Sequence, residues 1–234
     1  MLTRSPSHLS LSGIPFAEPP VGSLRLSLPR PKYSLSPLQS FDARNYGRPC
    51  LQPRVSPLDG TPAGVPPQLL ANMSEDCLTL NVFRPSGVDA YSSLPVMVWI
   101  HGGGFLCAWE YHHFLGKLMP FHRWCFFHLR RNASCQAICG SCTYPTHKSW
   151  VVHSLIDRHL QGTSVLYVSI NYRLGPLGFP QGPEAAKRGA LNLGLHDQQV
   201  ALQWVQKNIA SFGGDPRKVC LYTLPSCHSW YHGP

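Results

Sequence analysis

The interpretation of this chain depends on the stretch Pro95-Val96-Met97-Val98-Trp99-Ile100-His101-Gly102-Gly103-Gly104-Phe105. An apolar run rich in β-branched residues that ends at a glycine cluster is typical of a buried strand leading into a tight loop. Three successive glycines let the backbone turn without a Cβ atom and leave its N–H groups accessible. Two interpretations stay open at this point. The stretch is an ordinary glycine-rich turn, or it is a loop whose N–H groups donate to an acyl oxygen as that oxygen gains charge.

Length and composition bound the class of protein. The chain has 234 residues, of which 43% are hydrophobic, enough for one large α/β domain or two small ones. Lys and Arg number 20 against 11 Asp and Glu, which gives a formal net charge of +9. These charges are scattered and are not interleaved with aromatic residues, so we expect no nucleic-acid partner.

Membrane and export signals are sparse. The sequence holds no apolar run of 18 residues, so we expect no transmembrane segment. Residues 1–10 lack the apolar core of a signal peptide. The nine cysteines are an odd number, and two glycosylation sequons begin at Asn72 and Asn132.

Strand signals flank the glycine-rich loop on both sides. Residues 12–31 contain several prolines and glycines and are expected to be extended and rich in turns. Residues 77–83 alternate between apolar and polar and predict a strand, antiparallel to its neighbour at 95–101 because the link between them is short. Residues 165–172 form a nearly continuous apolar run that suits a strand buried on both faces.

The clearest helix covers residues 193–212. Its apolar residues predict one buried face made of Leu195, Leu202, Val205, Ile209 and Phe212. Gly213 and Gly214 are a helix stop signal, and a further strand is expected at 218–222. Strand, helix and strand in this order predict a βαβ unit with a parallel sheet.

Six motifs follow one another along the chain in this order: GIPFAEPPVGSLR, EDCLTLNVFRP, HGGGF, SINYRLGPLGF, GALNLGLHDQ and FGGDPRKV. Together, in this order, they resemble the motifs of type-B carboxylesterases and lipases. Their amino-acid sequences are most similar to those of the secreted fungal branch. The resemblance implies an incomplete α/β-hydrolase fold, the N-terminal part of a mixed, mostly parallel sheet with flanking helices. It also implies a small-molecule or lipid ester as substrate, no cofactor, and an extracellular location.

The resemblance is uneven along the chain. It implies one truncated carboxylesterase domain over residues 1–234, with a non-family insert at about 106–163 and a non-family tail at 223–234. The insert carries five of the nine cysteines and no helical or strand period. Its composition resembles translated non-coding sequence or an unusual splice choice.

The family's nucleophile elbow, Gly-x-Ser-x-Gly, is expected after the strand that ends at Tyr222. The residues here are Thr223-Leu224-Pro225-Ser226-Cys227, with Pro225 at the nucleophile position and Ser226 one residue late. The acid and the histidine of the triad follow later in the family and are not found in this sequence. We therefore expect the chain to lack all three triad members and to be inactive as an esterase.

The resemblance also assigns roles to individual residues. The N–H groups of Gly103 and Gly104 would belong to the oxyanion hole, His101 would be a structural loop residue, and Asn72 would be a glycosylation site. A disulfide and two buried ion pairs of the family carry over to the pairs Cys50–Cys77, Arg25–Glu75 and Arg173–Asp197.

Two other readings stay open. Within the insert, Cys135, Cys139 and Cys142 with His147 or His153 could bind zinc, although their spacing fits no strong zinc pattern. The chain could also be a non-catalytic binding member of the same family. Strand edges and apolar faces left without partners would make it poorly soluble when expressed alone.

Overall fold

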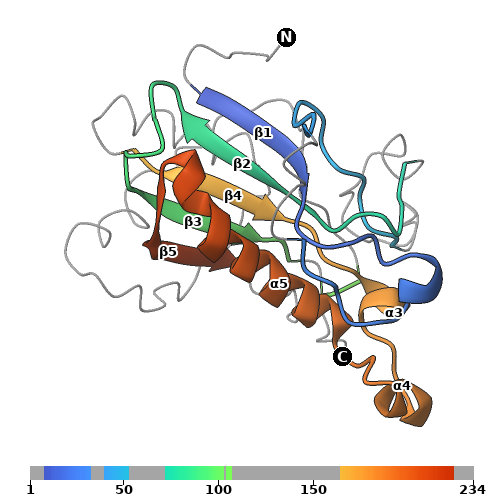
Figure 1. The fold of residues 1–234 in the computed structure, drawn as a ribbon. Coiled ribbons are helices and arrows are strands. Elements are labelled where there is room, and N and C mark those ends of the chain that lie inside the picture. Colours follow the sequence, from blue (N-terminus) through green and yellow to red (C-terminus); the bar gives the residue numbers. More distant parts are fainter. Residues whose placement is uncertain (1–7, 33–39, 53–71, 103, 107–163, 224–234) are drawn as a thin grey trace, which may run out of the picture.

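One mixed sheet of five strands organises the part of the chain that the structure describes (Figure 1). The structure is a computed structural model, and it describes residues 8–32, 40–52, 72–102, 104–106 and 164–223. The strands lie in the order β1-β2-β4-β3-β5. Their bounds are His8–Pro15 (β1), Thr79–Pro85 (β2), Leu94–Ile100 (β3), Leu166–Ile170 (β4) and Gly214–Thr223 (β5).

The sheet divides into an antiparallel and a parallel half. β1 pairs with β2 and β2 with β4 in antiparallel fashion, whereas β3 pairs in parallel with both β4 and β5. The parallel relation expected between the strands that flank the long helix is therefore confirmed, with β3 lying between them. All five residues of β4 are buried, as the unbroken apolar run at 165–172 predicts for an inner strand.

β2 and β3 run antiparallel, as expected, but the expectation that they are neighbours is wrong. β4 lies between these two strands, although it comes much later in the sequence. Residues 86–93 need to cross only two strand spacings, roughly 10 Å, which a short link can do. A short link therefore limits how far apart two strands lie but does not make them neighbours.

The first strand, β1, overlaps the start of residues 12–31, which are expected to be extended and rich in turns because of their prolines. β1 runs from His8 to Pro15 along the edge of the sheet, where a proline at the strand end removes no essential hydrogen bond. Its register shifts between Leu11 and Ile14, and there the N–H of Gly13 donates to Oδ1 of Asn81 at 2.9 Å. Residues after Pro15 are mostly loop, with a short 3-10 helix, η1, at Gly22–Leu24.

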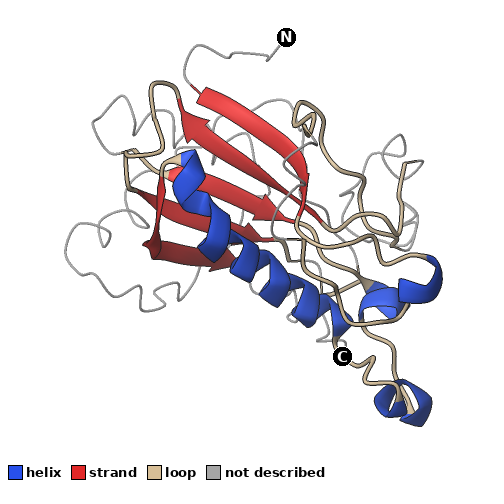
Figure 2. Cartoon of the chain, viewed as in Figure 1, coloured by secondary structure: helices blue, strands red, loops and turns tan. Residues whose placement is uncertain are grey.

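Helix α5, Leu193–Asn208, lies across one face of the sheet and continues as the 3-10 turn η3, Ile209–Phe212 (Figures 1 and 2). Two short helices, α3 at Gly175–Gly178 and α4 at Pro183–Lys187, precede it. Gly213 has φ +91° and ends the helical segment, as its position predicts. None of the described helices is both long and apolar enough to cross a membrane.

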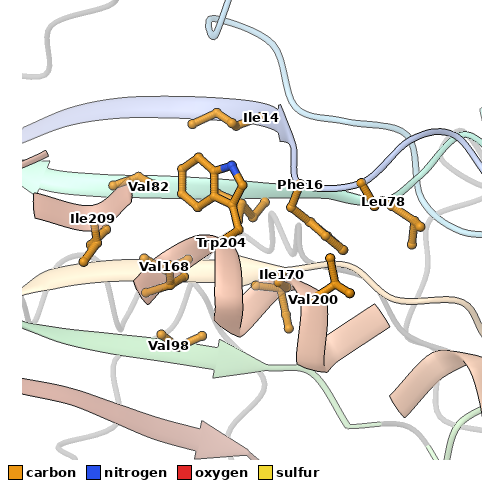
Figure 3. Close-up of a cluster of buried hydrophobic side chains, with 14 of the residues drawn as sticks. Ile14, Phe16, Leu78, Val82, Val98, Val168, Ile170, Val200, Trp204 and Ile209 are labelled. Carbon is orange, nitrogen blue, oxygen red and sulfur yellow. The ribbon is translucent and has the colours of Figure 1, made fainter. Parts of the chain in front are cut away.

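The main core fills the space between α5 and the sheet, where Trp204 and Ile209 face Val82, Val168 and other strand residues (Figure 3). The predicted helix face is wrong at its first member, because Leu195 is 44% exposed while Leu193 is fully buried. Gly194 explains this difference. A Cβ atom there would meet the carbonyl of Arg173 and the ring of Phe179, so the first turn packs tightly against that segment and Leu195 faces outward.

Candidate functional site

The glycine-rich loop begins directly after β3 with His101, which is contacted by Tyr172 from the segment that follows the neighbouring strand β4. His101 is 4% exposed, and its ring stacks on that of Tyr172 with 4.2 Å between centroids. The hydroxyl of Tyr172 donates to the carbonyl oxygen of His101 at 2.8 Å. Tyr172 comes just after β4, the parallel neighbour of β3, so both residues lie at the carboxyl edge of the sheet. This placement makes His101 a structural residue of the loop.

The far end of the loop is held by the segment that follows β4. Gly104 and Phe105 both have left-handed backbone conformations, with φ +61° and +62°. The N–H of Gly175, at the start of α3, donates to the carbonyl of Phe105 at 2.7 Å, and the rings of Phe105 and Phe179 lie 4.6 Å apart. A left-handed conformation is uncommon for a bulky residue and persists only where the surroundings enforce it. Of the two expected donors, Gly104 is described, and Gly103 lies outside the described residues.

Arg173 and Asp197 form a buried ion pair. The Nε and Nη2 atoms of Arg173 donate to the two oxygens of Asp197 at 2.8 and 2.7 Å. The Arg173 backbone N–H donates to the same carboxylate at 3.0 Å, and its Nη1 reaches the carbonyl of Ser27 at 2.9 Å. Burial raises the pKa of Asp197, and the guanidinium opposes that rise. The pair therefore links the end of β4 to α5 and to the loop after η1.

The second expected ion pair is present, but the expectation that it is buried is wrong. Arg25 donates to both carboxylate oxygens of Glu75 at 2.6 Å, yet its side chain remains 54% exposed. Arg25 follows η1 in a loop at the surface, where solvent reaches the guanidinium. A pair of this kind contributes little to stability because water and salt screen it.

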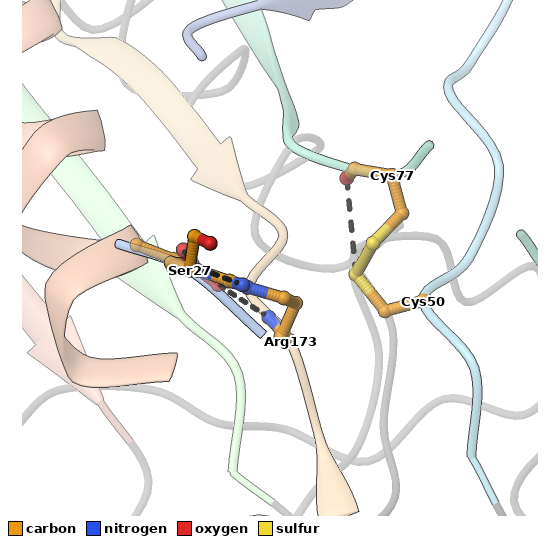
Figure 4. Close-up of polar contacts among 5 residues, drawn as sticks. Ser27, Cys50, Cys77 and Arg173 are labelled. Carbon is orange, nitrogen blue, oxygen red and sulfur yellow. Dashed lines mark hydrogen bonds and ion pairs between the residues drawn. A yellow bond between two sulfur atoms is a disulfide. The ribbon is translucent and has the colours of Figure 1, made fainter. Parts of the chain in front are cut away.

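The disulfide between Cys50 and Cys77 is present, with 5.1 Å between the Cα atoms (Figure 4). Both cysteines are buried, at 3% and 1% exposure. Next to them, Cys50 and Ser74 form an isolated parallel β-bridge, in which the Ser74 N–H donates to the carbonyl of Pro49 at 2.9 Å. The segment before β2 is thus attached to residues 49–50 by both covalent and backbone contacts.

Several predicted site residues fall outside the described part of the chain. The residue expected at the nucleophile position, Pro225, lies there together with its neighbours in 224–227. So do Asn132 of the second sequon and the proposed zinc ligands Cys135, Cys139, Cys142, His147 and His153. Among the residues that are described, no group of three or more His, Cys, Asp or Glu side chains could hold a metal ion. Asn72 is described, and it lies exposed in a turn.

Sequence reasoning missed the residues that support the loop. Tyr172, Gly175 and Phe179 all belong to the SINYRLGPLGF motif, of which only Arg173 received a role. A tyrosine that directly follows a buried strand gave a usable signal, because a buried phenol needs a hydrogen-bond partner. The identity of that partner, the His101 carbonyl, depends on β3 and β4 being neighbours.

Comparison with solved structures establishes the class of fold. The chain is similar to the Aspergillus niger esterase EstA, with a TM-score of 0.62 and 28% identity over 94% of this chain and 33% of that one. It is also similar to a thermophilic pNB esterase, with a TM-score of 0.64 and 32% identity over 95% of this chain and 36% of that one. The described residues therefore form part of an α/β-hydrolase fold.

The family follows from the sequence comparisons. The profile described as "Carboxylesterase family" matches residues 3–116 and 142–223, and the chain belongs to that family. It is 38% identical to Lipase 2 of Diutina rugosa over 90% of this chain and 33% of the relative. It is 36% identical to Secreted lipase 1 of Botryotinia fuckeliana, over 91% of this chain and 32% of the relative.

The extent of these matches matters for function. The chain spans about a third of the length of the curated relatives that it matches. The residues that the family profile leaves unmatched between its two segments, 117–141, lie inside the stretch 106–163 that the sequence sets apart. The limits of an insert and of a tail stay predictions.

Proposed function

We propose that this chain provides the amino-terminal part of a carboxylic-ester hydrolase scaffold, whose chemistry is acyl transfer through a serine. The observation that carries this proposal is the supported loop after β3. The segment that follows β4 fixes both ends of this loop: Tyr172 donates a hydrogen bond to the carbonyl of His101, and Gly175 donates one to the carbonyl of Phe105. A loop held in this way keeps its backbone N–H groups in place before a substrate arrives, which is what stabilisation of an oxyanion requires.

In this proposal Gly103 and Gly104 donate to the oxygen of the ester carbonyl as negative charge develops on it. Removing one such donor from a working hydrolase costs roughly 10²–10³ in rate. A third donor in α/β-hydrolases is the N–H of the residue after the nucleophile. Here that position follows Pro225, so the completed hole would depend on residues 225–226 adopting the geometry of an elbow.

The chain as its sequence stands is proposed to be inactive. Pro225 occupies the nucleophile position and has neither a hydroxyl group nor an N–H. Thr223 and Cys227 replace the glycines that permit the sharp turn of the elbow.

The proposed substrates of the scaffold are carboxylic esters of small molecules or lipids, and the proposed location is extracellular. Both proposals are supported by relatives named as lipases, among them one named as a secreted lipase. The Cys50–Cys77 disulfide supports the same location, because disulfides persist in oxidising compartments.

The test is hydrolysis of p-nitrophenyl acetate, p-nitrophenyl butyrate and an emulsified triglyceride by the purified 234-residue chain. Release of product at the rate of buffer alone is expected, with a full-length pNB esterase as the positive control. Turnover above buffer that disappears in Ser226→Ala would identify a displaced nucleophile and overturn the inactive assignment. Turnover that persists in Ser226→Ala would also overturn it and would place the nucleophile elsewhere.

The second candidate is ester binding without turnover. Two observations favour it. Gly104 and Phe105 adopt the left-handed conformation that shapes the loop, and the sequence has Pro225 at the proposed nucleophile position. Equilibrium binding of a non-hydrolysable phosphonate ester would measure it, with Gly104→Val as the matched variant. Binding by the parent chain that Gly104→Val abolishes would support this function, and equal binding by both would count against it.

A further inference from the structure

The sequon Asn72-Met73-Ser74 lies next to the disulfide, and the structure shows how the two are connected. Asn72 is exposed in a turn, whereas Ser74 is partly buried. Ser74 forms the parallel β-bridge with Cys50, and Cys77 follows it by three residues. The acceptor asparagine therefore points to solvent while the rest of its recognition motif is attached to the fold.

The hydroxyl of Ser74 is itself in use. Its Oγ accepts a hydrogen bond from the backbone N–H of Asp76 at 3.0 Å, and its own N–H donates to the Pro49 carbonyl at 2.9 Å. An N-glycosylation sequon is defined by the hydroxyl residue two positions after the asparagine, so the transferase must read that hydroxyl. The hydroxyl keeps its own O–H donor, but the backbone of Ser74 is paired in the bridge to Cys50, so that bridge has to open before the segment can enter a transferase site as a free extended chain.

The disulfide makes that release difficult. Cys50 and Cys77 are both buried, and their bond holds the residues that follow the sequon against residues 49–50. Since Cys50 precedes the sequon and Cys77 follows it closely, the bond can close as soon as Cys77 emerges into an oxidising compartment.

We propose that Asn72 is an N-glycan acceptor whose modification competes with closure of the Cys50–Cys77 disulfide, so that the glycan is added only while the bond is open. In the transfer, Nδ2 of Asn72 attacks C1 of the first sugar of a lipid-pyrophosphate-linked oligosaccharide. The C1–O bond breaks, a C1–N bond forms, the amide nitrogen loses one proton, and the lipid pyrophosphate leaves. Because Asn72 is exposed, the attached glycan extends into solvent without entering the core.

This inference rests on the proposed extracellular location, so the test supplies entry to the secretory pathway separately. The full chain, carrying Asn132→Gln to remove the other sequon, is translated with microsomes behind an added cleavable signal peptide. Glycan occupancy is read as a mobility shift that peptide N-glycosidase removes, and Asn72 is identified by mass spectrometry of its deglycosylated peptide. Ser74→Ala removes the sequon and should abolish the shift.

Partial occupancy is expected in the parent chain. Cys50→Ser should raise occupancy by about twofold or more, because disulfide formation, which takes seconds or longer, no longer withdraws the acceptor. Dithiothreitol added during translation should have the same effect on the parent and none on Cys50→Ser. An Asn72→Gln chain that retains Asn132 controls for a general effect of the reductant.

Each outcome decides one part of the inference. Absence of glycan at Asn72 in both the parent and Cys50→Ser overturns the acceptor assignment. Equal occupancy in the parent and Cys50→Ser overturns the competition. Because the added signal peptide imposes entry, neither result depends on whether the natural protein is exported, which a separate secretion assay on the native gene would determine.

Discussion

Arg173 and Asp197 are joined by three hydrogen bonds of 2.7–3.0 Å in a site where their side chains are 5% and 0% exposed. This contact connects the end of β4 to helix α5, which makes it a junction between the sheet and the helix that covers it. Charges removed from water in this way are stabilised only by each other and by their hydrogen bonds. The pair is therefore far more sensitive to loss of one partner than a surface pair would be.

Removal of the carboxylate should strongly destabilise the fold. Asp197→Ala leaves the guanidinium buried without a counter-charge, and we expect a loss of about 3–5 kcal/mol in the free energy of unfolding. Urea denaturation followed by tryptophan fluorescence measures it. Arg188→Ala, which breaks the exposed Arg188–Glu184 pair, is the control and should change little. A loss in Asp197→Ala as small as in this control would contradict the prediction.

The disulfide should contribute chiefly by restricting the unfolded chain. The bond joins residues separated by 27 positions, for which loop-closure entropy predicts about 3.5 kcal/mol. Cys50→Ser should lower the free energy of unfolding by an amount of this order under non-reducing conditions. Because Cys220 is also disulfide-bonded, a phosphine reductant acts on the variant too, and it should destabilise the parent by more than the variant, the excess being the contribution of the Cys50–Cys77 bond. A parent whose unfolding is insensitive to complete reduction would rule out this role.

The decrease in the free energy of unfolding at low pH should depend partly on Asp215. The side chain and backbone N–H of Arg217, with Lys218 nearby, lower the pKa of this carboxyl to about 2. Since the pKa in the unfolded chain is about 3.9, ionised Asp215 stabilises the fold above about pH 4, and this contribution is lost between pH 4 and 2. Asp215→Asn should therefore have a shallower loss of stability over that interval. Parallel stability–pH curves for the parent and the variant would refute this.

The revised helix face can be tested with two substitutions to alanine. Ile209 is fully buried under the sheet, so Ile209→Ala should cost about 2–5 kcal/mol through lost contacts and a cavity. Leu195, which the sequence places on the same face, is 44% exposed, and Leu195→Ala should change stability by less than about 0.5 kcal/mol. Equal losses at the two positions would restore the helix face that the sequence predicts.

The glycine after η3 should tolerate no side chain. Gly213 has φ +91°, and a Cβ atom there would collide with the carbonyl oxygen of Asp89. Gly22 also has a positive φ, +56°, but no atom lies within 4 Å of its ideal Cβ position. Gly22→Ala therefore measures backbone strain alone, of order 1 kcal/mol. Gly213→Ala should lower the unfolding midpoint well beyond that, and similar midpoints for both variants would show that the collision is relieved.

Much of the fold could be predicted from local patterns. The apolar runs at 95–101 and 165–172 correspond to β3 and β4, and Gly213 ends the helical segment where expected. β1 could not be recognised, because its pairing with β2 holds it in place despite Gly13 and Pro15. The order of the strands was also beyond local pattern, since it depends on pairings between residues far apart in the chain.

For the site, the sequence by itself determined which residues are available: a glycine loop after β3, Arg173 and Asp197, Cys50 and Cys77, and a proline where a nucleophile would be needed. The glycine loop follows from residue chemistry and spacing, whereas the two pairs and the nucleophile position are what the resemblance to carboxylesterases implies. Only the tertiary structure decided that Tyr172 holds His101, that Arg25 and Leu195 meet solvent, and that the sequon at Asn72 is attached to the disulfide. Exposure and hydrogen-bond partners are set by which segments pack together, and packing joins residues that no local pattern connects.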